Sequence, residues 1–124
     1  DLDEKYFISN LSITTYEYDE ENQKMIINYV YNPFYSTDDL YVEKALIYNT
    51  ISLSLVFKDL KIIESNYNGK KYVTTKEIIE NNYPYYSKIV DKKIDKDNFN
   101  IYLEKSLNYN EFVKEIFNKL FEEN

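Results

Sequence analysis

The chain has no cysteine, histidine or tryptophan, all 15 of its basic residues are lysine, and it has a single glycine. Without cysteine and histidine it cannot form a Ser-His-Asp triad, a Cys-His pair or a zinc site of the usual thiolate and imidazole type. One glycine is too few for a phosphate-binding loop, and the lack of arginine removes the forked side chain that binds carboxylates and phosphates. The sequence therefore predicts no enzyme of these classes, no bound metal and no cofactor.

Charge and hydrophobicity set further limits. The chain carries 22 acidic residues and a formal net charge of −7, and its lysines are dispersed among the acids. Clustered positive charge is what binds a phosphate backbone, so nucleic acid is not an expected partner. No apolar run approaches the ~20 residues that a membrane-spanning helix needs. With 124 residues, 44% of them hydrophobic, the chain is expected to form one domain over residues 1–124, with 1–5 as a disordered leader.

The chain begins with Asp1 rather than methionine, so we expect a trimmed or processed piece. A signal peptide, a lipid anchor or a membrane helix could have been removed upstream, and membrane attachment is expected only through such an anchor. The absence of cysteine is compatible with the cytosol and with the exterior of a Gram-positive cell. The sequence gives no indication of the oligomeric state.

Two segments near the N-terminus alternate between apolar and polar residues as strands do. Residues 6–18 and 24–31 show this pattern, and the acidic stretch 19–23 separates them. A hairpin of two long strands is expected. After Pro33, apolar residues recur at helical spacing over residues 38–59, with Thr37 as a suitable N-cap. This segment predicts the longest helix, with a broad buried stripe.

A second hairpin is expected over residues 60–67 and 70–74, because Asn68-Gly69 favours a type I′ turn. Thr74 and Glu77 fit a capping box that opens a short helix over 75–82, ending before Pro84.

Two more helices are expected beyond an ambiguous segment at 89–94, which fits a short strand or a helical turn. They cover 98–107, capped by Asp97, and a last helix that begins near Asn108 with Glu111 in a capping box. The sequence thus predicts an α+β fold: an antiparallel sheet of about four strands, in two hairpins, packed against one long central helix, with two or three shorter C-terminal helices.

Carboxylates are the only abundant groups left for catalysis or metal binding. Glu64, on the third predicted strand, is the nearest candidate for a general acid or base, and we expect it to face solvent. The stretch Asp91, Asp95, Asp97 and Asn98 departs from a calcium-binding loop, because a phenylalanine follows and no glycine does. We interpret it as a solvated turn.

Three tyrosines surround Pro84. Tyr83, Tyr85 and Tyr86 could form a surface for a sugar, a peptide or a protein partner, since tyrosine offers a large ring and a hydroxyl. The alternative is that they fill the junction between sheet and helices. The exposed side of the first hairpin is the other predicted partner surface.

Residues 43–80 resemble an uncharacterised bacterial family, domain of unknown function 4825. The resemblance covers about residues 11–90 and depends on the end of the long helix, the strand after it, the turn at Gly69 and the helix start at Thr74-Thr75 and Glu77. The strand segment with Asn28-Tyr29 also matches, whereas Lys76 stands where the family usually has arginine. The resemblance implies a secreted, lipid-anchored or membrane-tethered domain of low-GC Gram-positive bacteria, which in some members is fused to BlaR-type metallopeptidase sensors. It assigns no catalytic residues.

We therefore expect a non-enzymatic extracytoplasmic domain for binding, sensing or protein interaction, with a protein or a component of the cell envelope as partner. The first alternative is an acidic cytosolic or phage-borne protein that presents carboxylates to a basic protein as an interaction partner or inhibitor. The second is a carboxylate-based hydrolase, which requires a cleft with two facing acids.

Overall fold

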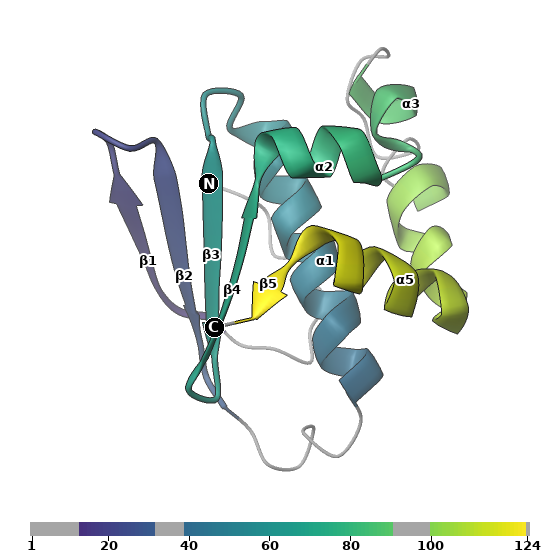
Figure 1. Cartoon of the computed structure of the whole chain (residues 1–124), viewed down its shortest axis with the longest axis horizontal. Coiled ribbons are helices and arrows are strands. Elements are labelled where there is room, and N and C mark those ends of the chain that lie inside the picture. The colour runs from purple at the N-terminus through teal and green to yellow at the C-terminus, as the bar shows by residue number, and fades with distance from the viewer. Residues whose placement is uncertain (1–12, 32–38, 91–99, 124) are drawn as a thin grey trace.

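The computed structural model describes residues 13–31, 39–90 and 100–123, and within them two hairpins form most of a five-stranded sheet (Figure 1). The first hairpin consists of β1 (Ile13–Asp19) and β2 (Lys24–Tyr29). The second consists of β3 (Ile62–Tyr67) and β4 (Lys70–Thr75). The short β5 (Glu122–Glu123) pairs antiparallel with β4, so that the strand order is β1-β2-β3-β4-β5.

Helix α1 (Asp39–Val56) connects the two hairpins. It crosses over so that the adjacent strands β2 and β3 run parallel to each other. β2 and β3 pair in parallel, with Met25 opposite Ile63 and Asn28 opposite Asn66. A parallel pair needs a crossover, and the 18 residues of α1 span about 27 Å at 1.5 Å each, enough to return the chain to the starting edge. The predicted α+β fold, with two hairpins, one long helix and shorter C-terminal helices, is confirmed. The crossover makes the sheet mixed rather than wholly antiparallel.

Both hairpin turns contain residues with positive φ. Asn68 (φ 51°) and Gly69 (φ 74°) form the second turn, as the Asn-Gly sequence predicts. In the first turn Gln23 has φ 51°, and its carbonyl accepts hydrogen bonds from the backbone N–H groups of Lys61 at 2.8 Å and Ile62 at 3.2 Å. The first turn is thereby attached to the start of β3, which fixes the register of the parallel pair.

The start of helix α2 (Lys76–Asn82) differs by one residue from the prediction. The N-cap is Thr75, whose hydroxyl accepts a hydrogen bond from the N–H of Ile78 at 3.1 Å. The capping box predicted at Thr74 is wrong, because Thr74 still belongs to β4 and its side chain is buried in the sheet. Two adjacent threonines give the same sequence signal, and only the alternation of β4 decides which of them is free to cap.

The C-terminal part of the chain forms a second layer of short helices: α3 (Tyr86–Val90), the π-helical turn η2 (Asn100–Glu104), the 3-10 turn η3 (Ser106–Asn108) and α5 (Asn110–Leu120). The single helix predicted over 98–107 is wrong over 100–107, where the two turns follow each other. One cause is Ser106, whose hydroxyl donates to the carbonyl of Leu103 at 2.7 Å and so competes with regular helix geometry.

Of the remaining predictions about helix ends and loops, some are wrong and others concern residues that the structure does not describe. The capping box at Asn108 and Glu111 is wrong, because α5 begins after Tyr109 without a side-chain cap. The predicted cap at Asp97, the leader 1–5, the N-cap Thr37 and residues 91–94 lie outside the described residues. α1 ends three residues before the predicted position 59, at Val56.

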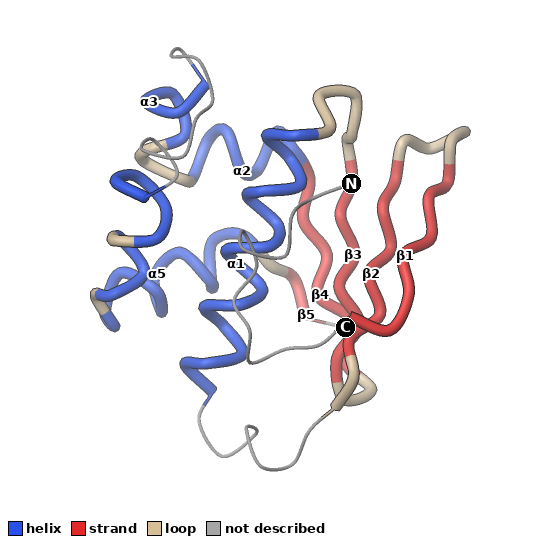
Figure 2. The backbone as a smooth tube through the Cα atoms, turned by 180° about the vertical axis from the view of Figure 1, so that it is seen from behind, coloured by secondary structure: helices blue, strands red, loops and turns tan. Residues whose placement is uncertain are grey.

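Helix α1 lies between the sheet and the layer that contains α2, α3 and α5 (Figures 1 and 2). Every residue from 45 to 55 is buried, on all sides of the helix. The sequence predicts a buried stripe, which is typical of a helix with one face in water, whereas this helix has a neighbour on each face. One continuous cluster of buried hydrophobic residues therefore runs from the sheet through α1 to α5.

The position of α1 predicts that substitutions at its centre and at its exposed end differ sharply in their effect on stability. Replacing Ile51, which is 0% exposed, by alanine should lower the free energy of unfolding by about 2–5 kcal/mol, because it leaves a cavity at the centre of the core. The matched control is Val56→Ala at the exposed end of α1, which should change it by less than about 0.5 kcal/mol. Urea denaturation followed by circular dichroism measures both. Equal effects would contradict the central position of α1.

Candidate functional site

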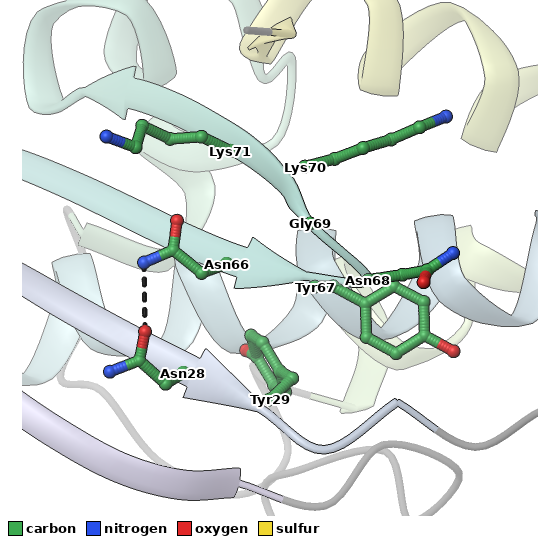
Figure 3. A pocket seen from close by; sticks show the side chains of 8 residues that line it. All are labelled: Asn28, Tyr29, Asn66, Tyr67, Asn68, Gly69, Lys70 and Lys71. Atoms are coloured by element: carbon green, nitrogen blue, oxygen red, sulfur yellow. Dashed lines mark hydrogen bonds between the residues drawn. The ribbon is translucent and has the colours of Figure 1, made fainter.

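A row of hydrogen-bonded polar side chains crosses the face of the sheet that points away from α1. Asn28 donates from Nδ2 to Thr15 Oγ1 at 2.8 Å and accepts at Oδ1 from Asn66 Nδ2 at 2.9 Å (Figure 3). Asn66 also donates to Glu64 Oε2 at 3.1 Å. The register explains the row, since Asn28 lies opposite both Thr15 on β1 and Asn66 on β3. We call these residues, with Lys24 and Lys71, the polar row.

Glu64 is the charged centre of the polar row. Its side chain is only 7% exposed, and Oε1 lies 3.0 Å from Nζ of Lys24 and 3.9 Å from Nζ of Lys71. Burial raises its pKa, but the hydrogen bonds from Lys24 and Asn66 and the charges of both lysines outweigh this effect and hold the pKa below its ordinary value. The prediction that Glu64 faces solvent is wrong, because side chains from β2 and β4 flank it. A lowered pKa suits an ion pair better than a general acid.

A shallow hollow of about 590 Å³ lies where β2 and β3 end. It is lined by Asn28, Tyr29, Asn66, Tyr67, Asn68, Gly69, Lys70 and Lys71 (Figure 3). We call it the strand-end hollow. It lies at the carboxyl ends of two parallel strands, the position where open α/β sheets commonly bind ligands. Sequence analysis missed it, because only the parallel register brings Asn28 next to Asn66.

A smaller cavity of about 160 Å³ adjoins the strand-end hollow. The two share Tyr67, Asn68 and Lys70, and the smaller one extends to Val42 and Glu43 of α1. Glu43 lies 3.3 Å from Lys114 of α5, so an ion pair joins α1 and α5 at this end. The end of the sheet near the second turn therefore carries two adjoining hollows.

A second surface feature is the outer edge of β1. Within the described residues, β1 is the outermost strand on its side of the sheet. Tyr16 and Tyr18 are 47% and 51% exposed, and as residues two apart on a strand they point to the same face. We call this strand and these two tyrosines the outer edge. It belongs to the exposed side of the first hairpin, which the sequence predicts as a partner surface.

The three tyrosines predicted as a partner surface occupy different environments. Tyr83 is buried, and its hydroxyl donates to the carbonyl of Tyr102 at 2.7 Å and lies 2.9 Å from the hydroxyl of Ser106. Burial raises the pKa of Tyr83 despite the hydrogen bond with Ser106. Tyr86 is also buried, and only Tyr85 is exposed, at 37%. Two of the three therefore fill the helical layer, and a binding role is sterically open to Tyr85 alone.

Among the described residues, no group of three acidic side chains lies close enough together to hold a metal ion. The stretch Asp91, Asp95, Asp97 and Asn98 lies outside them. No helix within the described ranges combines the length and the apolar character that crossing a membrane requires.

No protein-family model matches the chain, and no curated protein or solved structure shows significant similarity to it. The resemblance to domain of unknown function 4825 therefore stays a prediction. The candidate sites depend on the geometry and charge described above.

The polar row predicts how stability depends on pH. Because the pKa of Glu64 is lower in the folded than in the unfolded chain, its ionisation stabilises the fold above the unfolded pKa of about 4.3, and this contribution disappears as pH falls through the folded pKa. Glu64→Gln should therefore be less stable than the original chain at about pH 7, and the difference should shrink at about pH 3. The urea midpoints of the two chains at both pH values measure this difference in stability.

The matched control is Glu21→Gln, at an exposed position in the first hairpin turn, which should leave the urea midpoint at neutral pH within error. A stability difference for Glu64→Gln that stays constant with pH would show that the ionisation of Glu64 makes no contribution.

Proposed function

We propose that this chain is a non-enzymatic domain that binds a protein partner through its outer edge. The observation that carries the proposal is a seven-residue strand, β1, at the end of the sheet order, with two half-exposed tyrosines on one face. Long edge strands expose backbone N–H and C=O groups that pair readily with another chain, and proteins usually protect them with lysine, proline or a covering segment. β1 contains neither lysine nor proline.

An edge strand of this kind suits the addition of a partner strand. In that binding mode the backbone hydrogen bonds give affinity, and side chains at alternate positions give specificity. Tyr16 and Tyr18 supply large rings at such alternate positions, at a low cost in conformational entropy. Val30 and Tyr31, which follow β2 at the open end of the hairpin, are 46% and 43% exposed and add apolar groups to the surface there.

The charge of the first hairpin favours a basic partner. Glu17, Asp19, Glu20 and Glu21 lie on β1 and the turn, against one lysine at the start of β2. Asp19 accepts hydrogen bonds from Asn22 through both carboxylate oxygens, at 3.3 and 2.7 Å, and these bonds lower its pKa. Asp19 therefore keeps its negative charge to a lower pH than an ordinary aspartate does, and a partner strand that carries lysine or arginine fits this acidic hairpin best.

The same acidic turn supports a second candidate function, an acidic inhibitor that presents its carboxylates to a basic protein. In that case the charges rather than the strand edge provide the binding, so affinity would depend on salt and not on Tyr16 and Tyr18. A carboxylate-based hydrolase has less support, because Glu64, the acid with the most distinctive surroundings, is bound to lysine and lies beside Asn66 rather than facing a second free acid.

The proposal predicts binding of a synthetic strand-forming peptide that alternates lysine with valine. In NMR titrations the amide signals of β1 should shift, and a peptide with glutamate in place of lysine should bind more weakly because of the acidic turn. The double variant Tyr16→Ala, Tyr18→Ala should weaken binding about tenfold or more, as expected when two interface aromatics are lost.

Two control variants locate the surface. Tyr109→Ala removes a tyrosine that is 69% exposed next to α5 and should bind normally. Tyr85→Ala tests the surface predicted around Pro84. Shifts confined to the acidic turn, with full binding by the double variant, would favour the inhibitor. A titration with no shifts in β1 would reject the strand-addition proposal.

We further propose that the domain acts outside the cytoplasm, secreted or membrane-anchored, in a Gram-positive cell. The support is the sequence resemblance described above, and the absence of cysteine is compatible with this location. Expression of the full gene in a Gram-positive host, followed by protease treatment of intact cells, should remove the domain while a cytoplasmic marker survives. Protection of the domain until the cells are lysed would contradict this location.

A further inference from the structure

The strand-end hollow presents an ammonium group, that of Lys71, beside the side-chain amide of Asn66, although the chain as a whole is acidic. Lys71 shares the carboxylate of Glu64 with Lys24, which lies at the other end of β2 and does not line the hollow. The ammonium group of Lys71 attracts an anionic group of a ligand.

The two lysines of the β4 start are not equivalent. Lys70 and Lys71 point to opposite sides of the strand, as neighbours on a strand do (Figure 3). Lys71 extends on the side of Asn66, its partner across the β3–β4 pair, and its side chain is 52% exposed. At 3.9 Å its contact with Glu64 is loose, whereas Lys24 lies at 3.0 Å. Lys71 can therefore bind a ligand without leaving Glu64 unpaired.

Asn66 supplies the complementary group. Its Nδ2 is occupied, since it donates to both Asn28 and Glu64. These two bonds fix the orientation of the amide and leave Oδ1 as an acceptor on the side of Lys71 (Figure 3). A cationic donor and a neutral acceptor thus stand next to each other on adjacent strands. They match a ligand in which a carboxylate has a hydroxyl group close to it.

We propose that the strand-end hollow binds a sugar acid, a saccharide unit that carries a carboxylate and several hydroxyl groups. The carboxylate contacts Lys71 and a ligand hydroxyl donates to Asn66 Oδ1. The volume of about 590 Å³ falls in the range of small-molecule sites and accommodates a ligand of this size. Because the hollow is shallow and open to solvent, a single unit binds weakly. This site is separate from the outer edge and does not depend on the proposed function.

The test is an NMR titration of the whole chain with glucuronate at up to tens of millimolar, at constant ionic strength. Saturable shifts of the amide signals of residues 66–71 are expected, with smaller shifts at Asn28. Glucose, which lacks the carboxylate, and acetate, which lacks the hydroxyls, should each bind at least about tenfold more weakly, because each loses one of the two groups that the hollow recognises.

Lys71→Met keeps the length of the side chain and removes its charge, and it should weaken glucuronate binding about tenfold. Lys119→Met is the matched control on α5, where the lysine is 49% exposed and pairs with Glu115, and it should bind as the original chain does. Circular dichroism confirms that both variants are folded, and the shift mapping on the original chain is independent of them.

Three results would overturn the proposal. The first is the absence of saturable shifts at residues 66–71. The second is acetate binding as tightly as glucuronate, which would indicate a general anion site. The third is equal binding by the original chain and Lys71→Met.

Discussion

The burial of α1 on all sides is the constraint on which the rest of the structure depends. Eleven consecutive residues, 45–55, are shielded from water, so the helix must have the sheet on one side and α2, α3 and α5 on the other. The two hairpins pair directly through β2 and β3, and α5 packs against both α1 and β4. The side chains of α1 fill the space between the sheet and the C-terminal helices, so a change at its centre affects both layers at once.

The polar residues of α1 show how closely this arrangement is specified. Asn49 is fully buried, and its Nδ2 donates to the hydroxyl of Tyr29 on β2 at 2.9 Å. Burial raises the pKa of Tyr29, so the hydroxyl keeps its proton in the core. Ser54 donates to the carbonyl of Ile51 at 2.7 Å. The Asn49–Tyr29 bond favours one rotation of the helix on the sheet over the others.

The crossover through α1 also determines where the candidate site lies. Because β2 and β3 run in parallel, their carboxyl ends meet at one end of the sheet, next to the turn at Asn68 and Gly69. With an antiparallel junction Asn28 and Asn66 would not be neighbours, and the polar row would not form. The outer edge of β1 is a separate consequence, since the strand order leaves the first hairpin at the side of the sheet. One chain thus presents a strand edge and a strand-end hollow at different places.

The abundance of tyrosine has no single structural meaning in this protein. Tyr29, Tyr67 and Tyr83 are core residues, whereas Tyr16, Tyr18 and Tyr109 are exposed. The three tyrosines around Pro84 include both buried and exposed rings within four residues. Composition indicates how many rings the fold must accommodate, but not which of them reach the surface. Burial follows from the contacts of each ring, and neighbouring positions in the sequence often have different contacts.

Local patterns determined much of this protein directly from the sequence. The strands, the Asn-Gly turn and the long helix could be predicted, because alternation, positive φ at Asn68 and Gly69 and helical spacing act over a few residues. The exclusion of histidine and cysteine chemistry follows from composition alone. The tertiary structure decided the parallel pairing of β2 with β3, the burial of Glu64 between lysines and the contact between Asn28 and Asn66. The partners on β2 and β3, such as Asn28 and Asn66, are 38 positions apart, and their register depends on how α1 packs, which no local pattern encodes.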